Sequence, residues 1–230
     1  MNPLLLPLVA VQGRRARSRI EILPEAAGPT SGSTVDFGEP ALRVLVVGES
    51  TAAGCGAATH DEAFAGEFAR ALGELHDRSV RWTVHGRHGA TIRRVRHRMI
   101  PALDGDVDVA VLLIGVNDVL ARTPVVQWRD DLAAVVEALA ALAGRVVVAG
   151  IPPFDAFPSL PRALGTYLSE RGRALDAAAH EVCASDPTVS WMSSTGLAGA
   201  EAALFARDGF HPSPAGYRRW AHEIADRLVG

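Results

Sequence analysis

The chain has 230 residues, of which 48% are hydrophobic, and its formal net charge is −3 at pH 7. A chain of this length and composition buries a core of its own, which excludes a disordered or collagen-like protein. A net charge so close to zero argues against a nucleic-acid partner.

The amino terminus combines an apolar stretch over residues 3–11 with four arginines between positions 14 and 19. A secretory signal has its positive charge before the apolar stretch, so this order favours a cytoplasmic protein over a secreted one. The stretch is also shorter than the roughly 20 apolar residues that span a membrane. Two interpretations stay open: peripheral contact of residues 1–20 with an anionic membrane, and a leader that packs on the domain or is disordered.

Residues 24–41 are rich in Pro, Gly, Ser and Thr and predict a linker. We therefore expect a leader and linker over residues 1–40 and one domain over residues 41–230. From residue 41 onward, short β-branched runs alternate with longer helical patterns, which is typical of a parallel sheet covered on both faces. The predicted strands are 42–47, 80–85, 107–114, 145–151 and 188–192, and the predicted helices are 62–75, 125–142 and 214–228. This pattern predicts the α/β class, as a three-layer flavodoxin-like sandwich with a five-stranded parallel sheet.

Four short polar segments follow predicted strands or precede the last helix. They are Gly48-Glu49-Ser50, His85-Gly86-Arg87-His88-Gly89-Ala90-Thr91, Gly115-Val116-Asn117-Asp118 and Asp208-Gly209-Phe210-His211-Pro212. Ligands of open α/β sheets bind outside the carboxyl ends of the strands, so we expect active residues to gather at this edge.

Ser50 is a candidate nucleophile, although a lone serine after a strand is more often the cap of the next helix. A serine hydroxyl reacts at neutral pH only when a nearby base takes its proton. His211 can be that base, and Asp208, three residues earlier, can orient its other ring nitrogen. The backbone N–H groups of Ser50 and Gly89, with the side-chain amide of Asn117, complete a candidate oxyanion hole.

Asp118 is a rival acid, which we interpret as holding its own loop because only Asp208 has a short spacing to a histidine. His85 and His88 lie near the site and are interpreted as structural or as shaping its entrance. The sequence has no His-Glu-x-x-His or other metal-ligand spacing, so we expect no metal. Cys55 and Cys183 form no Cys-x-x-Cys pair and are predicted to be reduced, packed thiols.

At Ser50, Gly89, Asn117 and His211 the sequence resembles the SGNH, or GDSL-type, hydrolase family, in which the four blocks occur in this order. The resemblance spans the predicted domain and implies the same sandwich fold, no cofactor, and the activity of an esterase, lipase, thioesterase or carbohydrate O-deacetylase. One departure is Glu49, where the family usually carries Asp. Another is the second block, where an Asn-Gly-x-Ser-Gly pattern is frequent in the family.

A proline-rich loop follows the fourth predicted strand, and its apolar side chains could wall an acyl or aryl pocket: Phe154, Phe157 and Leu160. The sequence therefore predicts a serine ester hydrolase that acts on acyl or aryl esters of small molecules or lipids. Two alternatives stay open, namely a carbohydrate O-deacetylase and a non-catalytic binding module of the same fold.

Overall fold

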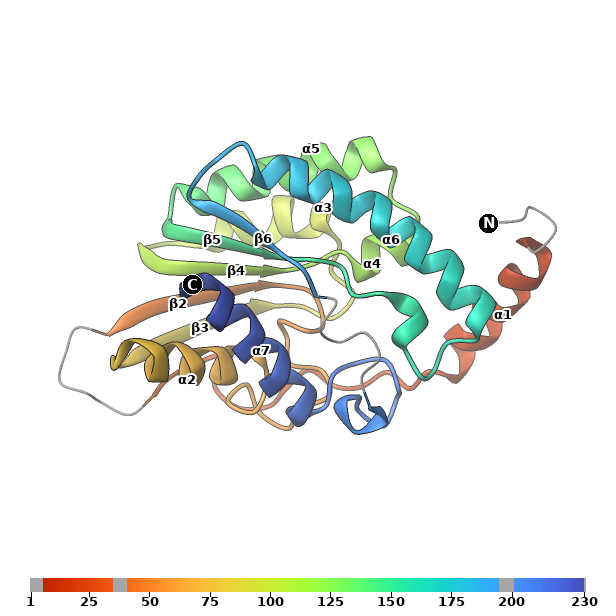
Figure 1. The fold of residues 1–230 in the computed structure, drawn as a ribbon, viewed down its shortest axis with the longest axis horizontal. Coiled ribbons are helices and arrows are strands. Elements are labelled where there is room, and N and C mark those ends of the chain that lie inside the picture. The colour runs from red at the N-terminus through yellow and green to blue at the C-terminus, as the bar shows by residue number, and fades with distance from the viewer. Residues whose placement is uncertain (1–5, 35–40, 195–200, 230) are drawn as a thin grey trace.

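The computed structural model describes residues 6–34, 41–194 and 201–229. Within these residues a six-stranded sheet with the order β1-β3-β2-β4-β5-β6 lies between two layers of helices (Figure 1). The strands are β1 (Ser31–Ser33), β2 (Leu42–Gly48), β3 (Val80–Gly86), β4 (Val107–Leu113), β5 (Ala143–Ala149) and β6 (Val189–Met192). Strands β2 to β6 pair in parallel, so the predicted α/β sandwich with five parallel strands is confirmed.

The sheet also has a sixth strand that the sequence did not predict. Strand β1 pairs antiparallel with β3 and lies inside the stretch that composition assigned to a linker. Its sequence, Ser-Gly-Ser, lacks the β-branched and aromatic residues that indicate strands. Gly32 instead fits because it has no side chain, since a Cβ atom there would lie 2.4 Å from the ring of Trp82.

Burial explains why β2 and β4 form the middle of the sheet. Val46, Val47, Val111 and Leu112 are fully buried, and a continuous apolar run is expected of a parallel strand covered on both faces. Such strands end abruptly where the polar segments begin. The carboxyl edge of the sheet is therefore the place where polar side chains from several loops meet.

Helices α3, α5 and α6 cover one face of the sheet, and α2 and α7 cover the other (Figure 1). The helices are α1 (Leu6–Arg19), α2 (Phe64–His76), α3 (Ile92–Arg94), α4 (Val116–Ala121), α5 (Val125–Ala140), α6 (Arg162–Cys183) and α7 (Pro214–Val229). Short helical turns occur at Val95–Met99, Ile100–Ala102, Phe154–Ala156 and Ala202–Leu204. The three predicted helices correspond to α2, α5 and α7, whereas α1, α3, α4 and α6 were not predicted.

Helix α1 extends from one end of the molecule and contacts α6 (Figure 1). Its buried residues are Val9 and Ala16, and Gln12 Oε1 accepts a hydrogen bond from the Leu164 N–H at 3.2 Å. Residues 3–5 of the apolar tip and residues 35–40 of the expected linker lie outside the described residues. The division of the chain after residue 40 stays a prediction.

Candidate active site

Ser50 lies two residues beyond β2, at the carboxyl edge of the sheet, and is 6% exposed. The turn that carries it depends on Gly48, whose φ is +151°. A Cβ atom at this position would lie 1.9 Å from the carbonyl oxygen of Leu113 on β4. Only glycine lets β2 approach β4 this closely, so the local sequence sets where the serine emerges.

The side chains of Ser50, His211 and Asp208 form a continuous hydrogen-bonded chain. Ser50 Oγ lies 2.9 Å from His211 Nε2, and His211 Nδ1 lies 2.6 Å from Asp208 Oδ2. An ionised carboxylate only accepts hydrogen bonds, so Asp208 places the imidazole proton on Nδ1. Nε2 is then free to accept the hydroxyl proton of Ser50, which is the arrangement that activates a serine.

Asp208 is held in a tight turn just before α7. Its Oδ1 accepts the backbone N–H groups of Phe210 and His211, each at 3.0 Å. Burial alone would raise the pKa of Asp208, but the hydrogen bonds from His211 and Phe210 lower it below its usual range. The carboxyl group therefore stays ionised at neutral pH, as an orienting acid must.

Gly89 and Asn117, the two other predicted oxyanion residues, lie on neighbouring loops. Gly89 has φ +73° in the turn after β3, and no heavy atom lies within 4 Å of the position of a Cβ there. Asn117 lies in the first turn of α4. Its side-chain Nδ2 donates to Glu49 Oε2 at 2.6 Å and to the carbonyl of Ala90 at 3.1 Å. These bonds link the first, second and third polar segments.

Glu49 has a structural role that the sequence did not indicate. It is 2% exposed, and its carboxylate also accepts the backbone N–H groups of Val116 and Asn117, at 3.0 and 2.9 Å. Burial raises the pKa of Glu49 to about 8, although these N–H donors act in the opposite direction. The only sequence signal was its departure from the usual Asp, which gave no partner.

Asp118 occupies the place expected of a structural residue, whereas His88 is exposed and lies beside His211. Asp118 is fully buried, and its oxygens accept bonds from the Ile92 N–H at 2.9 Å and the Thr123 hydroxyl at 3.0 Å. Burial raises its pKa to about 6. The ring of His88 lies 6.1 Å from that of His211 between centroids. Asp118 thus ties the second and third loops together, while Asp208 is the acid on His211.

A small apolar cavity of about 40 Å³ opens beside Ser50 and His211. Its wall is formed by side chains from the ends of β4 and β5, from α7 and from the loop before it: Leu113, Ala149, Leu204, Phe205, Phe210 and Trp220. Of the three predicted pocket residues, Phe157 lines this cavity. Phe154 is fully buried in the core and Leu160 packs against it, so we assign neither to the cavity. Phe205 and Phe210 were missed, although Phe205 lies three residues before Asp208 and Phe210 directly precedes His211.

No group of three or more His, Cys, Asp or Glu side chains suited to a metal ion occurs within residues 6–34, 41–194 and 201–229. In the same ranges, no helix is long and apolar enough to cross a membrane.

Cys55 and Cys183 are both buried and free. Burial raises the pKa of each thiol to about 12.

The structure is thus an α/β sandwich with a candidate serine nucleophile at the carboxyl edge of its sheet. The chain belongs to the GDSL-like lipase/acylhydrolase family, which it matches over residues 46–219. This confirms the resemblance to SGNH hydrolases, and the matched range contains all four name residues, Ser50, Gly89, Asn117 and His211.

Individual relatives agree with this assignment. The chain is 26% identical over 182 residues to the GDSL-like esterase Rv1075c of Mycobacterium tuberculosis. The match covers 76% of this chain and 58% of that relative, so the chain spans little more than half of the relative's length.

Two solved structures show the same fold. The hydrolase LAE5 from the metagenome of Lake Arreo has a TM-score of 0.66 at 16% identity, covering 84% of this chain and 99% of that one. A family 3 carbohydrate esterase of Clostridium thermocellum has a TM-score of 0.62 at 18% identity, covering 83% and 100%.

Proposed function

We propose that the protein is a serine ester hydrolase that works through an acyl-enzyme intermediate. The observation that carries this proposal is the chain from Ser50 Oγ to His211 Nε2 at 2.9 Å and from His211 Nδ1 to Asp208 Oδ2 at 2.6 Å. All three side chains are buried to more than nine-tenths, where solvent weakens such interactions least.

The reaction follows from these contacts. Ser50 Oγ attacks the ester carbonyl carbon while its proton passes to His211 Nε2, and Asp208 stabilises the imidazolium through Nδ1. The tetrahedral intermediate collapses, and its C–O bond breaks as His211 returns the proton to the leaving alcohol. Water then attacks the acyl group on Ser50 with His211 again as base, which releases the acid and restores the hydroxyl.

The negative oxygen of the intermediate would be stabilised by the N–H groups of Ser50, Gly89 and Asn117. Asn117 Nδ2 already has two acceptors, Glu49 Oε2 and the Ala90 carbonyl. An oxyanion that takes an N–H from Asn117 therefore competes with Ala90, while Glu49 keeps its bond. Because the oxyanion carries a full charge and the carbonyl does not, the stronger hydrogen bond forms with the oxyanion.

The size of the cavity supports a short acyl group as the substrate's acid part. A cavity of about 10–15 Å³ holds one water molecule and about 150 Å³ holds benzene, so a volume near 40 Å³ suits about two to four carbon atoms. Its wall offers mainly hydrocarbon, which favours an unbranched apolar acyl chain.

Hydrolysis of p-nitrophenyl esters of increasing acyl length tests the proposal. We expect activity to be highest with acetate to butyrate and lower with longer chains, and Ser50→Ala to lose at least about a thousandfold in kcat. Equal rates for the wild type and Ser50→Ala would contradict the assignment of the nucleophile.

A carbohydrate O-deacetylase is the second candidate, because an acetyl group is the smallest acyl group that fits this cavity. Release of acetate from acetylated saccharides, with little hydrolysis of propionyl and butyryl esters, would favour it. Equal hydrolysis of acetyl and butyryl esters, without release from the saccharides, would favour a general short-chain esterase.

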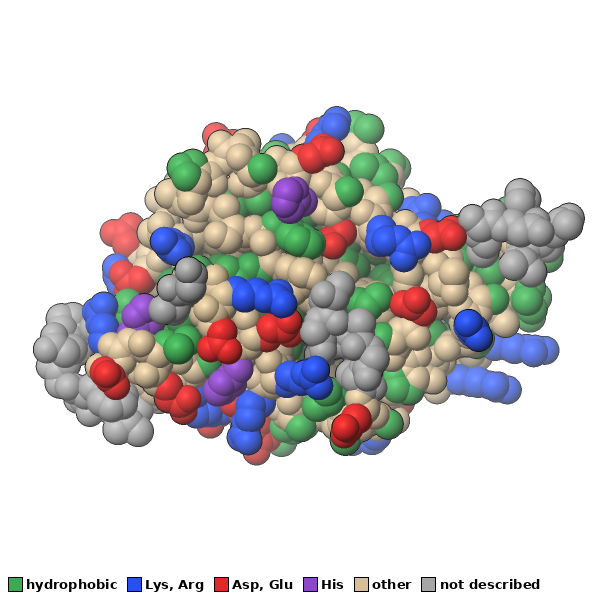
Figure 2. Space-filling view, viewed as in Figure 1, with side chains coloured by type: hydrophobic (Ala, Val, Ile, Leu, Met, Phe, Trp, Pro, Cys, Tyr) green, Lys and Arg blue, Asp and Glu red, His purple; other side chains and the backbone are tan. Residues whose placement is uncertain are grey.

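We further propose that residues 1–20 make a peripheral contact with anionic membranes. In the described part of this segment, Leu6, Leu8 and Val11 are exposed. Arginine side chains project from the end of the molecule that α1 occupies (Figure 2), and α1 itself contains no acidic residue. An apolar tip beside clustered arginines suits an anionic lipid surface. Sedimentation with phosphatidylserine vesicles should fall when residues 1–20 are deleted, and unchanged sedimentation would contradict this contact.

A further inference from the structure

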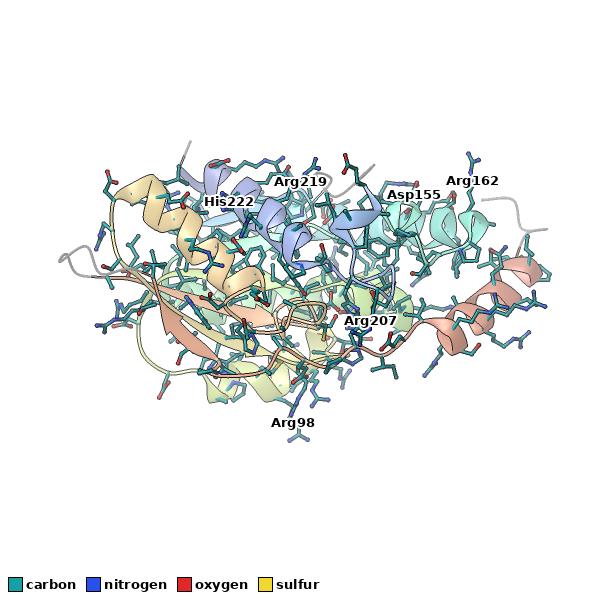
Figure 3. All side chains as sticks on the ribbon, turned by 90° about the horizontal axis from the view of Figure 1, so that it is seen from below. Arg98, Asp155, Arg162, Arg207, Arg219 and His222 are labelled. Atoms are coloured by element: carbon teal, nitrogen blue, oxygen red, sulfur yellow. The ribbon has the colours of Figure 1, made fainter. Side chains whose placement is uncertain are left out.

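The segment between α1 and β1, residues 20–30, runs beside the carboxyl edge of the sheet. Arg207 forms an ion pair with Glu21 of this segment, and Figure 3 shows Arg207 beside the chain that leaves α1. The segment's described hydrogen bonds reach three of the four loops that carry candidate site residues. We call residues 20–30 the strap.

The first contact of the strap is with the loop after Ser50. The backbone N–H groups of Ala26 and Ala27 donate to the carbonyls of Ala53 and Ala58, both at 2.9 Å. The two segments are so close that a Cβ atom on Gly54 would lie 2.6 Å from the Cβ of Ala26. Within the same loop, the Ala53 N–H donates to the carbonyl of Glu49 at 2.9 Å, which connects the contact with the strap to the residue directly before Ser50.

The second contact is with the loop that carries Gly89. Glu25 Oε1 accepts the backbone N–H of His88 at 2.8 Å, and Glu25 Oε2 lies 3.3 Å from Arg87 Nη1. The bond to His88 holds the peptide that joins Arg87 to His88, which lies one peptide before the N–H of Gly89. It therefore acts on the residue next to the one whose N–H is to face the oxyanion.

The third contact is with the loop that carries Asp208. The carboxylate of Glu21 binds Arg207 through Nε at 3.0 Å and Nη2 at 2.8 Å. Both side chains are well exposed, so this ion pair alone contributes little to stability. The ion pair matters because of its position: Arg207 directly precedes Asp208, the acid that orients His211.

We propose that the strap aligns the catalytic loops and that Glu25 is a positioning residue for the oxyanion hole, acting through the His88 N–H. This inference rests on the proposed esterase function. A displacement of about 1 Å in a group that stabilises the transition state costs up to about a hundredfold in rate. Gly89 lies in a turn of positive φ with open space on the side where a Cβ would project, so a bond to the preceding residue is an effective way to fix the direction of its N–H.

Three variants separate this role from a general effect on folding. Glu25→Ala removes the acceptor, and we expect kcat to fall about tenfold with KM changed less than about twofold. Glu25→Gln keeps an amide oxygen for the His88 N–H and should retain most of the activity. Asp108→Ala is the matched control, since Asp108 also accepts a backbone N–H, that of Arg43 at 2.7 Å, and pairs with its guanidinium, but at the opposite edge of the sheet.

Hydrogen exchange measured by mass spectrometry gives a readout that does not depend on catalysis. In Glu25→Ala, peptides covering residues 86–91 should exchange faster than in the wild type, whereas Asp108→Ala should leave them unchanged. Unchanged exchange and unchanged kcat in Glu25→Ala would overturn the inference, and so would an equal loss of kcat in Glu25→Gln. A wild type without esterase activity would contradict the proposed function, while the exchange data would still decide whether the strap holds this loop.

Discussion

Glu49 and Asn117 are joined by two hydrogen bonds, from the Asn117 backbone N–H at 2.9 Å and from its side-chain amide at 2.6 Å. The contact links the residue next to the candidate nucleophile with a candidate oxyanion donor from another loop. The family usually has Asp where this chain has Glu, and the longer side chain reaches α4 in this protein. Glu49 therefore has the geometry of a positioning residue for Asn117.

Replacement of Glu49 by alanine should lower kcat about tenfold or more, because the Asn117 amide loses the acceptor that fixes its direction. KM for p-nitrophenyl acetate should change little. Glu67→Ala is a suitable control, since Glu67 is an equally buried carboxylate that binds Arg70 and Arg218 away from Ser50. If the two variants lose the same fraction of kcat, Glu49 has no special relation to the site.

Titration of Glu49 should make stability depend on pH. Its pKa is raised to about 8 in the folded protein, so the folded state binds this proton more tightly than the unfolded state. The stabilisation is complete below the ordinary pKa of a glutamate and is lost as the pH rises through about 8. The free energy of unfolding should therefore fall more steeply between about pH 5 and pH 8 in the wild type than in Glu49→Gln.

Urea denaturation at several pH values makes this comparison. Asp118, whose pKa is also raised by burial, is present in both proteins, so the difference between them reports Glu49 together with its repulsion by Asp118. Parallel pH dependence in the wild type and Glu49→Gln would contradict a raised pKa for Glu49.

Gly48→Ala should destabilise the protein far more than an ordinary substitution at a glycine of positive φ. A Cβ atom there would lie 1.9 Å from the Leu113 carbonyl oxygen, so β2 and β4 must separate. Gly105→Ala is the control, because Gly105 has φ +76° and open space around it, which leaves only a backbone cost of about 1–2 kcal/mol. Similar urea midpoints for the two variants would show that the close approach at Gly48 is unimportant.

Leu204→Ala should shift the acyl-length preference toward longer chains. Leu204 is half-buried and lines the small cavity beside Ser50, so its removal adds room for further methylene groups. The ratio of kcat/KM for p-nitrophenyl hexanoate to that for acetate should rise about tenfold. Leu75→Ala makes the same chemical change at the end of α2, remote from the cavity, and should leave the ratio unchanged. An unaltered ratio in Leu204→Ala would exclude this cavity as the acyl site.

The fold could be predicted from the sequence because its central strands are strongly buried and therefore continuously apolar. The valine-rich runs of β2, β4 and β5 form the middle of the sheet, as their composition predicts. Helix α6 was missed because much of its buried face consists of small residues, including Gly165, Ser169, Gly172 and Ala178, which give little hydrophobic contrast. Strand β1 was missed because a Ser-Gly-Ser segment becomes a strand only by pairing with β3, a long-range contact that its own residues do not indicate.

The site was predictable as far as it depends on residue type and order. His211 lies within hydrogen-bond reach of both Ser50 and Asp208, as the chemistry of these side chains requires. The contacts of Glu49 with Asn117 and of Glu25 with His88 join residues more than 60 positions apart. No local pattern encodes such pairs, because they depend on how the loops pack at the sheet edge. The cavity likewise depends on the packing of the loop that carries Leu204 and Phe205.

Trapping of the acyl group on the protein is the most direct test of Ser50 as the nucleophile. The protein is mixed briefly with p-nitrophenyl acetate, quenched in acid and digested, and its peptides are analysed by mass spectrometry. We expect a single acetyl group on Ser50 in the wild type and none in Ser50→Ala. Acetylation of a different residue, or hydrolysis by Ser50→Ala at the wild-type rate, would contradict this assignment.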